Sequence, residues 1–498
     1  MEREYSEFLG LVRELGALDQ IGGLLTWDEE TYIPPGAVPD RAIQKAALTG
    51  IVHERLTSRK MGRLLSSLRK HKRLNPDQKV VVREMLRKHK RATAIPKELL
   101  QEISKTESLA MQAWVKARKA KDYKSFEPLL RKMIGLKAKV AECVGYEDRP
   151  YDALLDEYEP YMKTSEVEVL FSRFRDKLVP VVSKILDCST KVDESPVKGD
   201  FPEEKQRLFL LDIVKQIGYS LDTGRMDVAP HPFTVGSMRD VRITVRYDEH
   251  DLRPAVFGAV HEAGHGMYEQ GFLEKYYHTP LAESISLGIH ESQSRMWENI
   301  VGRGLPFWRH FLPKLQTVFP SMAGVRAEDF QRAVNTVKRS FIRVEADEVT
   351  YNLHVMLRFE VENAIFSGKL KTSEIPGFWN ERFENYLGLK VPDDAQGCLQ
   401  DIHWSIGALG YFPTYSLGTI YATQLYDKAK KDLPGLEDQF AQGNFSGLLG
   451  WLRKNVHSQG KRYGASDLIK RVTGEGLNED HFLRYLKQKY GAIYGISL

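Results

Sequence analysis

The chain has 498 residues and a net charge of +5, with 28% charged and 42% hydrophobic residues. This length can bury a large core, either as two domains or as one helical body with two lobes. No apolar run approaches the roughly 18 residues that a membrane span needs, so we expect no membrane segment. The three cysteines, Cys143, Cys188 and Cys398, are too few and too scattered for a disulfide framework or a cysteine-based metal site.

The N-terminal stretch MEREYSEFLGLVRELG predicts a charged amphipathic helix. It has neither the apolar core nor the small-residue cleavage site of a signal peptide, so we expect a cytoplasmic protein. The later run LRKHKRLNPDQKVVVREMLRKHKR is basic, but it has no Phe, Tyr or Trp on which bases could stack. A solvated helix face explains this run better than a nucleic-acid site does, so no nucleic-acid partner is expected.

Helical periodicity or helix-forming composition extends over most of the chain, with breaks at Gly and Pro. We therefore expect an all-α, mostly helical fold. The predicted helices cover residues 2–22, 40–70, 76–92, 96–121, 124–143, 164–190, 202–218, 253–272, 281–302, 305–318, 326–339, 343–367, 373–386, 416–433, 435–442, 445–456 and 464–473.

One polar stretch with Pro and Gly, at 191–204, is the only candidate linker. It suggests a single domain over 1–498 that has two lobes. The first, at 1–200, would be an N-terminal helical lobe or lid, and the second, at 201–498, would contain the chemistry described below.

The stretch VGSMRDVRITVRYDE, at 235–249, departs from the helical pattern. Val241, Ile243 and Val245 alternate with polar residues, which is the period of a strand with one buried face. We expect this strand to belong to one small antiparallel sheet directly before the next helix. An edge of that sheet along a cleft would let an extended peptide add to it by backbone hydrogen bonds.

That next helix includes FGAVHEAGHGMYEQG, at 257–271. Four residues correspond to about 400° of helical turn, so His261 and His265 project from one face. Two imidazoles one turn apart can bind a single Zn²⁺, and Glu262 then lies where it can take a proton from a water molecule. A sequence of this length can contain these three residues by chance. The motif therefore indicates a metal site only if the rest of the chain supplies a third ligand.

A catalytic zinc needs a third protein ligand and one open position. Glu269 is one turn beyond His265, but a third ligand from the same helix would strain a tetrahedral site. A second helix is the better source, and LAESISLGIHESQSRMWENIVG predicts one. We favour Glu291, which has small neighbours, with Glu283 as the alternative.

Several motifs resemble those of one family. HEAGH followed by HESQ at 290–293 is similar to the M32 metallocarboxypeptidases, which include thermostable carboxypeptidases of bacteria and archaea. The resemblance extends over nearly the whole chain, with further motifs in the same order. These are LLTWDEETYIPPGAVPDRAIQ near the N-terminus, YDALLDEYEP at 151–160, HPF at 231–233, DVRIT at 240–244, IRVEAD at 342–347 and GCLQDIHW at 397–404.

The resemblance implies a mostly helical, two-lobed body with a deep central groove and one metal ion per chain. The metal would be zinc or cobalt, held by His261, His265 and Glu291, and the protein would be a homodimer. Its activity would be the removal of single residues from the free C-termini of peptides, with Glu262 as the base. No departure from the family motifs is found at the metal or base positions.

The family motifs also indicate residues that would bind substrate. A carboxypeptidase has to bind a free carboxylate, which an arginine guanidinium does with two parallel hydrogen bonds. Arg343 and Arg242 are the candidates, although Arg343 could instead form a structural pair with Asp347. His231, His403 and Tyr415 are candidates to stabilise the oxyanion.

Further residues are expected behind those that touch metal or substrate. His290 points away from Glu291 on a helix, so we expect it to support the site or pack beside it, together with Asp240 and Asp401. Within GYFPTYSLG, the sequence does not decide whether Tyr411 or Tyr415 faces the metal.

Two other functions remain open. A zinc oligopeptidase that cuts internal bonds of short peptides would use the same helix but would not need a carboxylate-binding arginine. A helical scaffold that binds partners without catalysis would gain nothing from Glu262 beside the metal.

Overall fold

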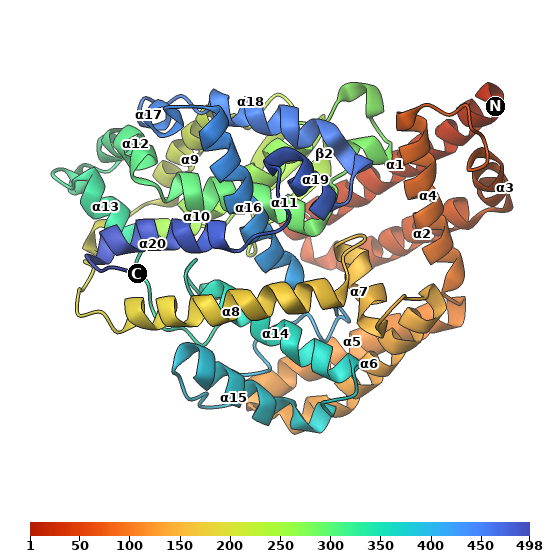
Figure 1. Cartoon of the computed structure of the whole chain (residues 1–498), viewed down its shortest axis with the longest axis horizontal. Coiled ribbons are helices and arrows are strands. Elements are labelled where there is room, and N and C mark those ends of the chain that lie inside the picture. The colour runs from red at the N-terminus through yellow and green to blue at the C-terminus, as the bar shows by residue number, and fades with distance from the viewer.

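The structure is a computed structural model that describes residues 1–498. The chain folds mainly into helices and has one small sheet, which confirms the predicted mostly helical fold (Figure 1). Every helix is too short or too polar to cross a lipid bilayer. The division into an N-terminal and a catalytic lobe, and the deep groove between them, stay predictions.

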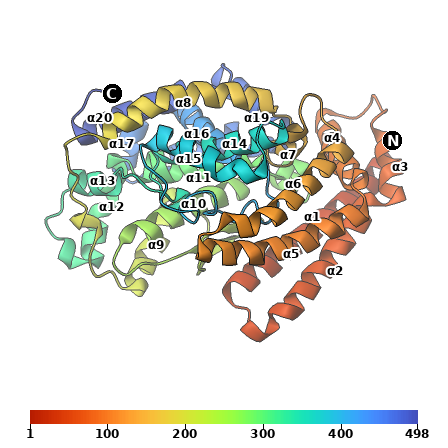
Figure 2. The same cartoon turned by 90° about the horizontal axis from the view of Figure 1, so that it is seen from below.

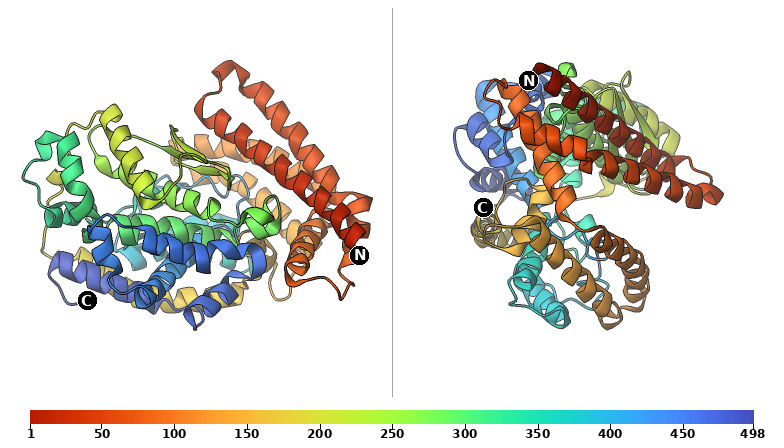
Figure 3. Two further views of the ribbon diagram at one scale, coloured as in Figure 1. Left: turned by 90° about the horizontal axis from the view of Figure 1, so that it is seen from above. Right: turned by 90° about the vertical axis from the view of Figure 1, so that its right-hand side faces the viewer.

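Long paired helices form the N-terminal part. α1 and α2 extend side by side at one end of the molecule, and α3 and α4 lie beside them (Figures 2 and 3). α5 and α6 form a second pair. The helices of the first half are α1 (Glu2–Thr31), α2 (Val38–Thr57), α3 (Arg59–Leu68), α4 (Pro76–Ala94), α5 (Lys97–Ala120), α6 (Tyr123–Val144), α7 (Pro150–Tyr158), α8 (Thr164–Leu186) and α9 (Glu203–Ile217).

The second half surrounds a central layer made by α10, α11 and α16. Its helices are α10 (Leu252–Glu269), α11 (Leu287–Arg295), α12 (Leu305–Val318), α13 (Ala327–Val334), α14 (Tyr351–Phe366), α15 (Ile375–Leu387), α16 (Pro413–Asp432), α17 (Leu436–Ala441), α18 (Ser446–Asn455), α19 (Ala465–Thr473) and α20 (Asp480–Tyr494). A π-helical segment, η5 (Met296–Gly302), continues α11, and a short 3-10 turn, η7 (Arg343–Glu345), precedes α14.

The buried apolar residues form two clusters. The larger contains 99 residues, begins at Ala110 and includes the central helices. The smaller contains 12 residues, mostly from α1, α3 and α4, with Leu281 as its contact from the second half of the chain. The N-terminal helices therefore have a small core of their own.

The prediction of an antiparallel sheet is wrong in part, because the sheet is mixed. Its strands are β1 (Gly224–Val228), β2 (Thr234–Ser237) and β3 (Asp240–Val245), in the order β1-β3-β2. β2 and β3 form an antiparallel hairpin, whereas β1 pairs with β3 in parallel. The chain reverses direction twice between β1 and β3, so these two strands run the same way. The alternation of buried and polar residues in β3 could not predict this, because it carries no information about the direction of the neighbouring strands.

Some predicted helix boundaries also differ. The predicted helix at 343–367 begins only at Tyr351, because the Asp347 carboxylate accepts the backbone N–H groups of Val349 and Thr350, both at 3.0 Å, and fixes a non-helical turn there. The predicted helix at 281–302 starts at Leu287. Two helices, α7 and α20, were not predicted.

Candidate metal and catalytic site

The central helix α10 presents both histidines of the H-E-x-x-H motif on one face. Its first turn is capped by Asp251, whose side chain accepts the backbone N–H of Arg253 at 3.0 Å. The ring centroids of His261 and His265 are 4.9 Å apart. β3 ends shortly before this helix and packs against it, so the sheet fixes its position.

Two glycines allow the helices of the site to approach closely. A Cβ atom at Gly264 of α10 would lie 2.7 Å from the Cα of Ser294 in α11, and one at Gly418 of α16 would lie 2.7 Å from the Cβ of Glu291. Larger residues at either position would push α11 away from its neighbours. The close packing brings Glu291 to the two histidines.

The structure groups His261, His265 and Glu291, with one ligand atom from each lying within 4.8 Å of the others. The Nε2 atoms of His261 and His265 are 3.7 and 3.5 Å from Glu291 Oε2. Burial raises the pKa of Glu291, but Arg295 and His261 outweigh burial and hold that pKa well below its usual range. Arg295 donates to Glu291 Oε1 at 2.6 Å, whereas Oε2, which lies 3.1 Å from the hydroxyl of Ser294, faces the histidines.

The two histidines have different surroundings. His261 Nδ1 is 2.8 Å from Glu298 Oε2. Burial lowers the pKa of His261, but Glu291 and Glu298 outweigh it and raise that pKa to about 9. Burial, with the neighbouring His290, lowers the pKa of His265 to about 3. Glu298 thus directs Nε2 of His261 toward Glu291, as an outer carboxylate does for many metal-binding histidines.

The candidate base Glu262 is buried next to this group. Its Oε2 accepts a hydrogen bond of 2.6 Å from the hydroxyl of Thr234, at the start of β2. Burial raises the pKa of Glu262. Thr234 therefore connects the sheet to the candidate base.

The other glutamates considered as ligands lie elsewhere. Glu283 accepts hydrogen bonds of 2.8 Å from Lys88 and 2.6 Å from Lys461, so its carboxylate is already neutralised by two ammonium groups. Glu269 turns to His290, whose Nε2 is 3.1 Å from Glu269 Oε1. His290 in turn stacks on His265 with ring centroids 4.3 Å apart, which restricts the rotation of that imidazole.

Arg343 lies in a buried cluster together with Asp401. Its Nη2 donates to Asp401 Oδ1 at 2.8 Å, and its Nη1 donates to the hydroxyl of Tyr351 at 2.7 Å. Arg358 donates to the other oxygen of Asp401 at 2.6 Å. The structural partner of Arg343 is therefore Asp401 rather than Asp347, which lies in the turn before α14.

His403 and Tyr415 belong to the same cluster. The ring centroid of Tyr415 lies 5.0 Å from the guanidinium carbon of Arg343 and 6.5 Å from the ring of His403. The ring centroid of Tyr411 lies 5.3 Å from that of His403 and 5.4 Å from that of Tyr415. Burial lowers the pKa of His403 to about 4, which keeps its imidazole neutral near pH 7.

The structure does not bring every candidate to the metal group. Arg242 pairs with Asp240 at 2.8 Å, and its guanidinium lies 4.1 Å from the ring centre of Trp27 in α1. His231 is exposed in the loop before β2. Arg242 and Asp240 thus lie beside the N-terminal helices, and His231 faces solvent. The roles predicted for these three residues stay predictions.

Sequence reasoning missed three groups that support the site: Thr234, Glu298 and Arg295. Glu298 is seven residues after Glu291 and was visible as one glutamate among several. Thr234 and Glu298 have partners distant in the chain, Glu262 and His261, and no local pattern marks such a pairing. Two spacings could have suggested a common helix face: the i, i+4 spacing of Glu291 and Arg295, and the spacing of two turns between Glu291 and Glu298.

Comparison with known proteins agrees with this geometry. Residues 7–490 match the family described as "Carboxypeptidase Taq (M32) metallopeptidase". The chain is 41% identical to thermostable carboxypeptidase 1 of Thermus thermophilus, with 99% of each chain covered, and 39% identical to thermostable carboxypeptidase 1 of Pyrococcus furiosus, with 97% of this chain and 98% of the relative covered.

A solved structure gives the same result for the fold. The crystal structure of the M32 carboxypeptidase from Deinococcus radiodurans R1 superposes with a TM-score of 0.96 at 38% identity, covering 99% of this chain and 100% of that one. Both the sequence and the fold match over almost their full length. The chain therefore belongs to the Carboxypeptidase Taq (M32) metallopeptidase family and is a metallocarboxypeptidase.

Proposed function

We propose that this chain releases single amino acids from the free C-terminus of peptides by zinc-dependent activation of water. The observation that carries the proposal is the group of His261, His265 and Glu291 with the buried carboxyl of Glu262 beside it. A metal site in a non-catalytic scaffold has no use for a buried base, which argues against that alternative.

Two of the three separations between the ligand atoms fit a zinc ion. Tetrahedral Zn²⁺ with bonds of about 2.0–2.2 Å separates its donors by about 3.3–3.6 Å. The separations from the Nε2 atoms of His261 and His265 to Glu291 Oε2, 3.7 and 3.5 Å, are close to this range. When bound, Zn²⁺ supplies a Lewis acid, which lowers the pKa of water toward about 7 and stabilises negative charge on oxygen. Co²⁺ is the alternative metal, with one ion per chain in either case.

Glu262 moves the proton. Its carboxylate accepts a proton from the attacking water and delivers it to the leaving amine. The hydrogen bond from Thr234, at 2.6 Å, holds one carboxyl oxygen and leaves the other free for this transfer. The raised pKa of Glu262, caused by burial, makes the carboxylate a stronger base than one in water. No covalent intermediate is needed.

The buried cluster around Arg343 supports recognition of a free C-terminus. Arg343 and Arg358 share the single carboxylate of Asp401, so these three groups retain one positive charge. A C-terminal carboxylate supplies the missing negative charge, and an amide does not. His403 and Tyr415, beside this cluster, are proposed as donors to the substrate or to the oxyanion. Arg242 is the second candidate for the carboxylate.

The sheet edge supports an extended substrate. β2 is an edge strand, and its first residue, Thr234, bonds the candidate base. A cavity of about 310 Å³ adjoins β2 at residues 235–237 and reaches Glu269 and α1. We propose that the peptide pairs with β2 and places the residues before the scissile bond in this cavity.

An oligopeptidase that cuts internal bonds is the second candidate. The bonds of Arg343 to Asp401 and Tyr351 favour it, because they already occupy most of the guanidinium donors. Under this alternative, Arg343 has a structural role and the C-terminal carboxylate is not recognised.

Matched peptides with a free or an amidated C-terminus distinguish the two functions. We expect amidation to lower kcat/KM by at least about 10²-fold, because a buried guanidinium cluster is left with an unbalanced charge. Arg343→Lys should reduce this discrimination, and Arg242→Lys serves as the matched variant for the second candidate. Equal rates on both peptides with the wild-type protein would favour the oligopeptidase.

The family resemblance also supports a homodimer and a two-lobed body with its active site in a central groove. Light scattering coupled to size-exclusion chromatography tests the dimer. The proposed partners are therefore peptide substrates and a second copy of the chain, and the proposed location is the cytoplasm.

A further inference from the structure

In the π-helical segment η5, the backbone carbonyl of Asn299 receives neither of the two backbone N–H groups that close the segment. η5 directly follows α11 and carries Glu298, the partner of His261. The backbone N–H of Arg303 donates to the carbonyl of Glu298, and that of Gly304 donates to Val301, both at 3.0 Å. The carbonyl of Asn299, between these acceptors, receives neither. A buried carbonyl left without a donor costs free energy, so it needs a partner from elsewhere.

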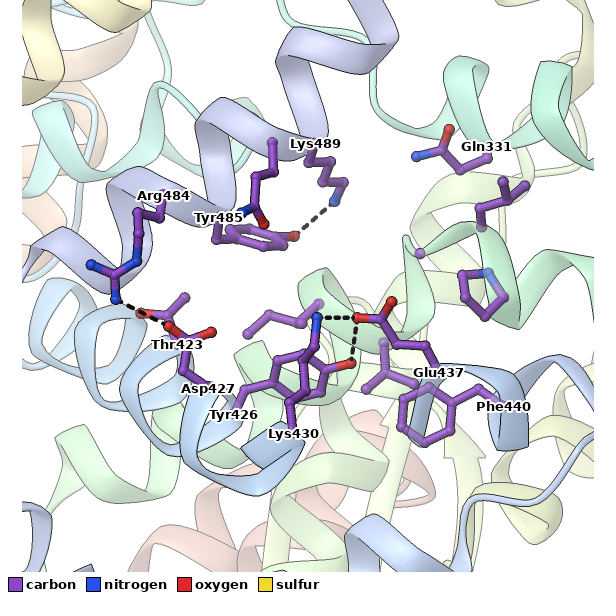
Figure 4. Close-up of a pocket in the computed structure, with 16 residues that line it drawn as sticks. Gln331, Thr423, Tyr426, Asp427, Lys430, Glu437, Phe440, Arg484, Tyr485 and Lys489 are labelled. Carbon is purple, nitrogen blue, oxygen red and sulfur yellow. Dashed lines mark hydrogen bonds and ion pairs between the residues drawn. The ribbon is translucent and has the colours of Figure 1, made fainter. Parts of the chain in front are cut away.

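Two side chains of the C-terminal helix supply that partner. The hydroxyl of Tyr485 donates to the Asn299 carbonyl at 2.9 Å, and the ammonium of Lys489 donates to it at 3.1 Å. The ammonium of Lys489 also donates to the carboxylate of Glu348, just before α14, and the hydroxyl of Tyr485 lies 3.0 Å from that carboxylate. Tyr485 and Lys489 lie together on α20 at the wall of a cavity of about 300 Å³ (Figure 4).

The backbone at Asn299 is directly coupled to the carboxylate that orients His261. Glu298 is the preceding residue, and its Oε1 accepts a hydrogen bond of 3.2 Å from Arg303. Arg303 also donates to the side chain of Asn299 at 3.2 Å. A rotation of the peptide unit at Asn299 would therefore move Glu298 and change both of its hydrogen bonds. π-helical segments are rare and often occur at functional sites.

We propose that Tyr485 and Lys489 are positioning residues for the metal site. They fix the Asn299 carbonyl, which fixes the π-helical turn, and this turn keeps Glu298 bonded to Nδ1 of His261. The C-terminal helix thereby controls the orientation of a metal-binding imidazole that it does not touch. This inference rests on the proposed metal site.

Tyr490 provides a matched control. Its hydroxyl donates to Glu348 at 2.7 Å, and the Tyr485 hydroxyl lies 3.0 Å from the same carboxylate, but Tyr490 makes no bond to Asn299. Tyr485→Phe and Tyr490→Phe each remove one buried hydroxyl from the same carboxylate. Only Tyr485→Phe removes a donor from the π-helical turn.

The experiment measures the dissociation constant of Zn²⁺ for the full-length chain by competition with a chelator. Removal of a group that orients a metal-binding histidine typically weakens metal affinity by about 10- to 100-fold. We expect Glu298→Gln to fall in this range, Tyr485→Phe to weaken affinity by about 3- to 10-fold, and Tyr490→Phe to change it less than about twofold. Lys489→Met gives a second test, with the fold of each variant checked by circular dichroism.

A double-variant cycle separates positioning from a general loss of stability. If Tyr485 acts through Glu298, adding Tyr485→Phe to Glu298→Gln should weaken Zn²⁺ binding no further. Equal effects of Tyr485→Phe and Tyr490→Phe, or full additivity with Glu298→Gln, would overturn the inference while leaving the metal site intact. An unchanged affinity in Glu291→Ala would overturn the proposed metal site itself.

Discussion

Glu262 combines two properties that a general base needs: it is buried beside the candidate ligands, and the hydroxyl of Thr234 holds its side chain. Glutamine has the same size and can keep the bond to Thr234. We expect Glu262→Gln to retain the metal and lose about 10²- to 10⁴-fold in kcat, since loss of a general base costs about that much. Kinetics and metal analysis on the same preparation check this. Loss of metal together with activity would instead assign Glu262 a structural role.

The third ligand can be identified by comparing three glutamates. Glu291→Ala should lower the zinc content after dialysis sharply, because it removes the carboxylate that faces both histidines. Glu283→Ala and Glu269→Ala should retain zinc, since Glu283 is neutralised by lysines and Glu269 turns to His290. Full zinc occupancy in Glu291→Ala would contradict the ligand set.

At the scale of secondary structure, the start of α11 depends on a buried acid from the end of α7. Glu159 accepts hydrogen bonds from the hydroxyl of Ser286 at 2.9 Å, from the backbone N–H of Gly288 at 3.0 Å and from the hydroxyl of Tyr421 at 2.9 Å. Burial raises the pKa of Glu159 to about 7, although these hydrogen bonds oppose the rise. The helix that carries Glu291 is thus held by a carboxyl group that ionises near neutral pH.

The raised pKa predicts a pH-dependent contribution to stability. The pKa of Glu159 in the folded state lies above the unfolded value of 4.5. Its contribution to the free energy of unfolding is therefore full below about pH 4.5 and is lost as the pH rises through about 7. Between about pH 5 and pH 8 we expect the wild type to lose about 2–3 kcal/mol of unfolding free energy relative to Glu159→Gln, which cannot ionise. Denaturant unfolding of both metal-free proteins checks this. Parallel pH curves would mean that Glu159 stays ionised throughout.

At the scale of the whole molecule, the separate cluster in α1, α3 and α4 predicts uneven stability. Twelve buried residues form this cluster, against 99 in the larger one. A small core supports a segment that opens independently of the rest. The N-terminal helices should therefore exchange their amide hydrogens faster than α10, α11 and α16.

A cavity in the smaller cluster should affect that segment alone. Met61 is fully buried in α3, and Met61→Ala should destabilise the N-terminal helices by about 2–5 kcal/mol. Hydrogen exchange followed by mass spectrometry should show faster exchange in α1, α3 and α4 and no change in α10. Leu210→Ala, in the larger cluster, is the matched control and should leave the N-terminal helices unaffected. Faster exchange throughout the chain in Met61→Ala would indicate one cooperative unit.

The sequence by itself determined what depends on short separations along the chain. The helical period places His261 and His265 on one face and Glu262 beside them, and it sets Glu291 on a second helix. The mostly helical fold follows from the same periodicity. The ordered motifs pointed to the family to which the chain belongs.

Only the tertiary structure decided which distant segments meet. The parallel pairing of β1 with β3, the bond from Thr234 to Glu262 and the pairing of Arg343 with Asp401 each join residues whose local patterns contain no sign of their partner. The same holds for the bond between Tyr485 and the carbonyl of Asn299, 186 residues apart in the chain. Local spacing is fixed by backbone geometry, whereas these contacts depend on how all the helices pack around a common core.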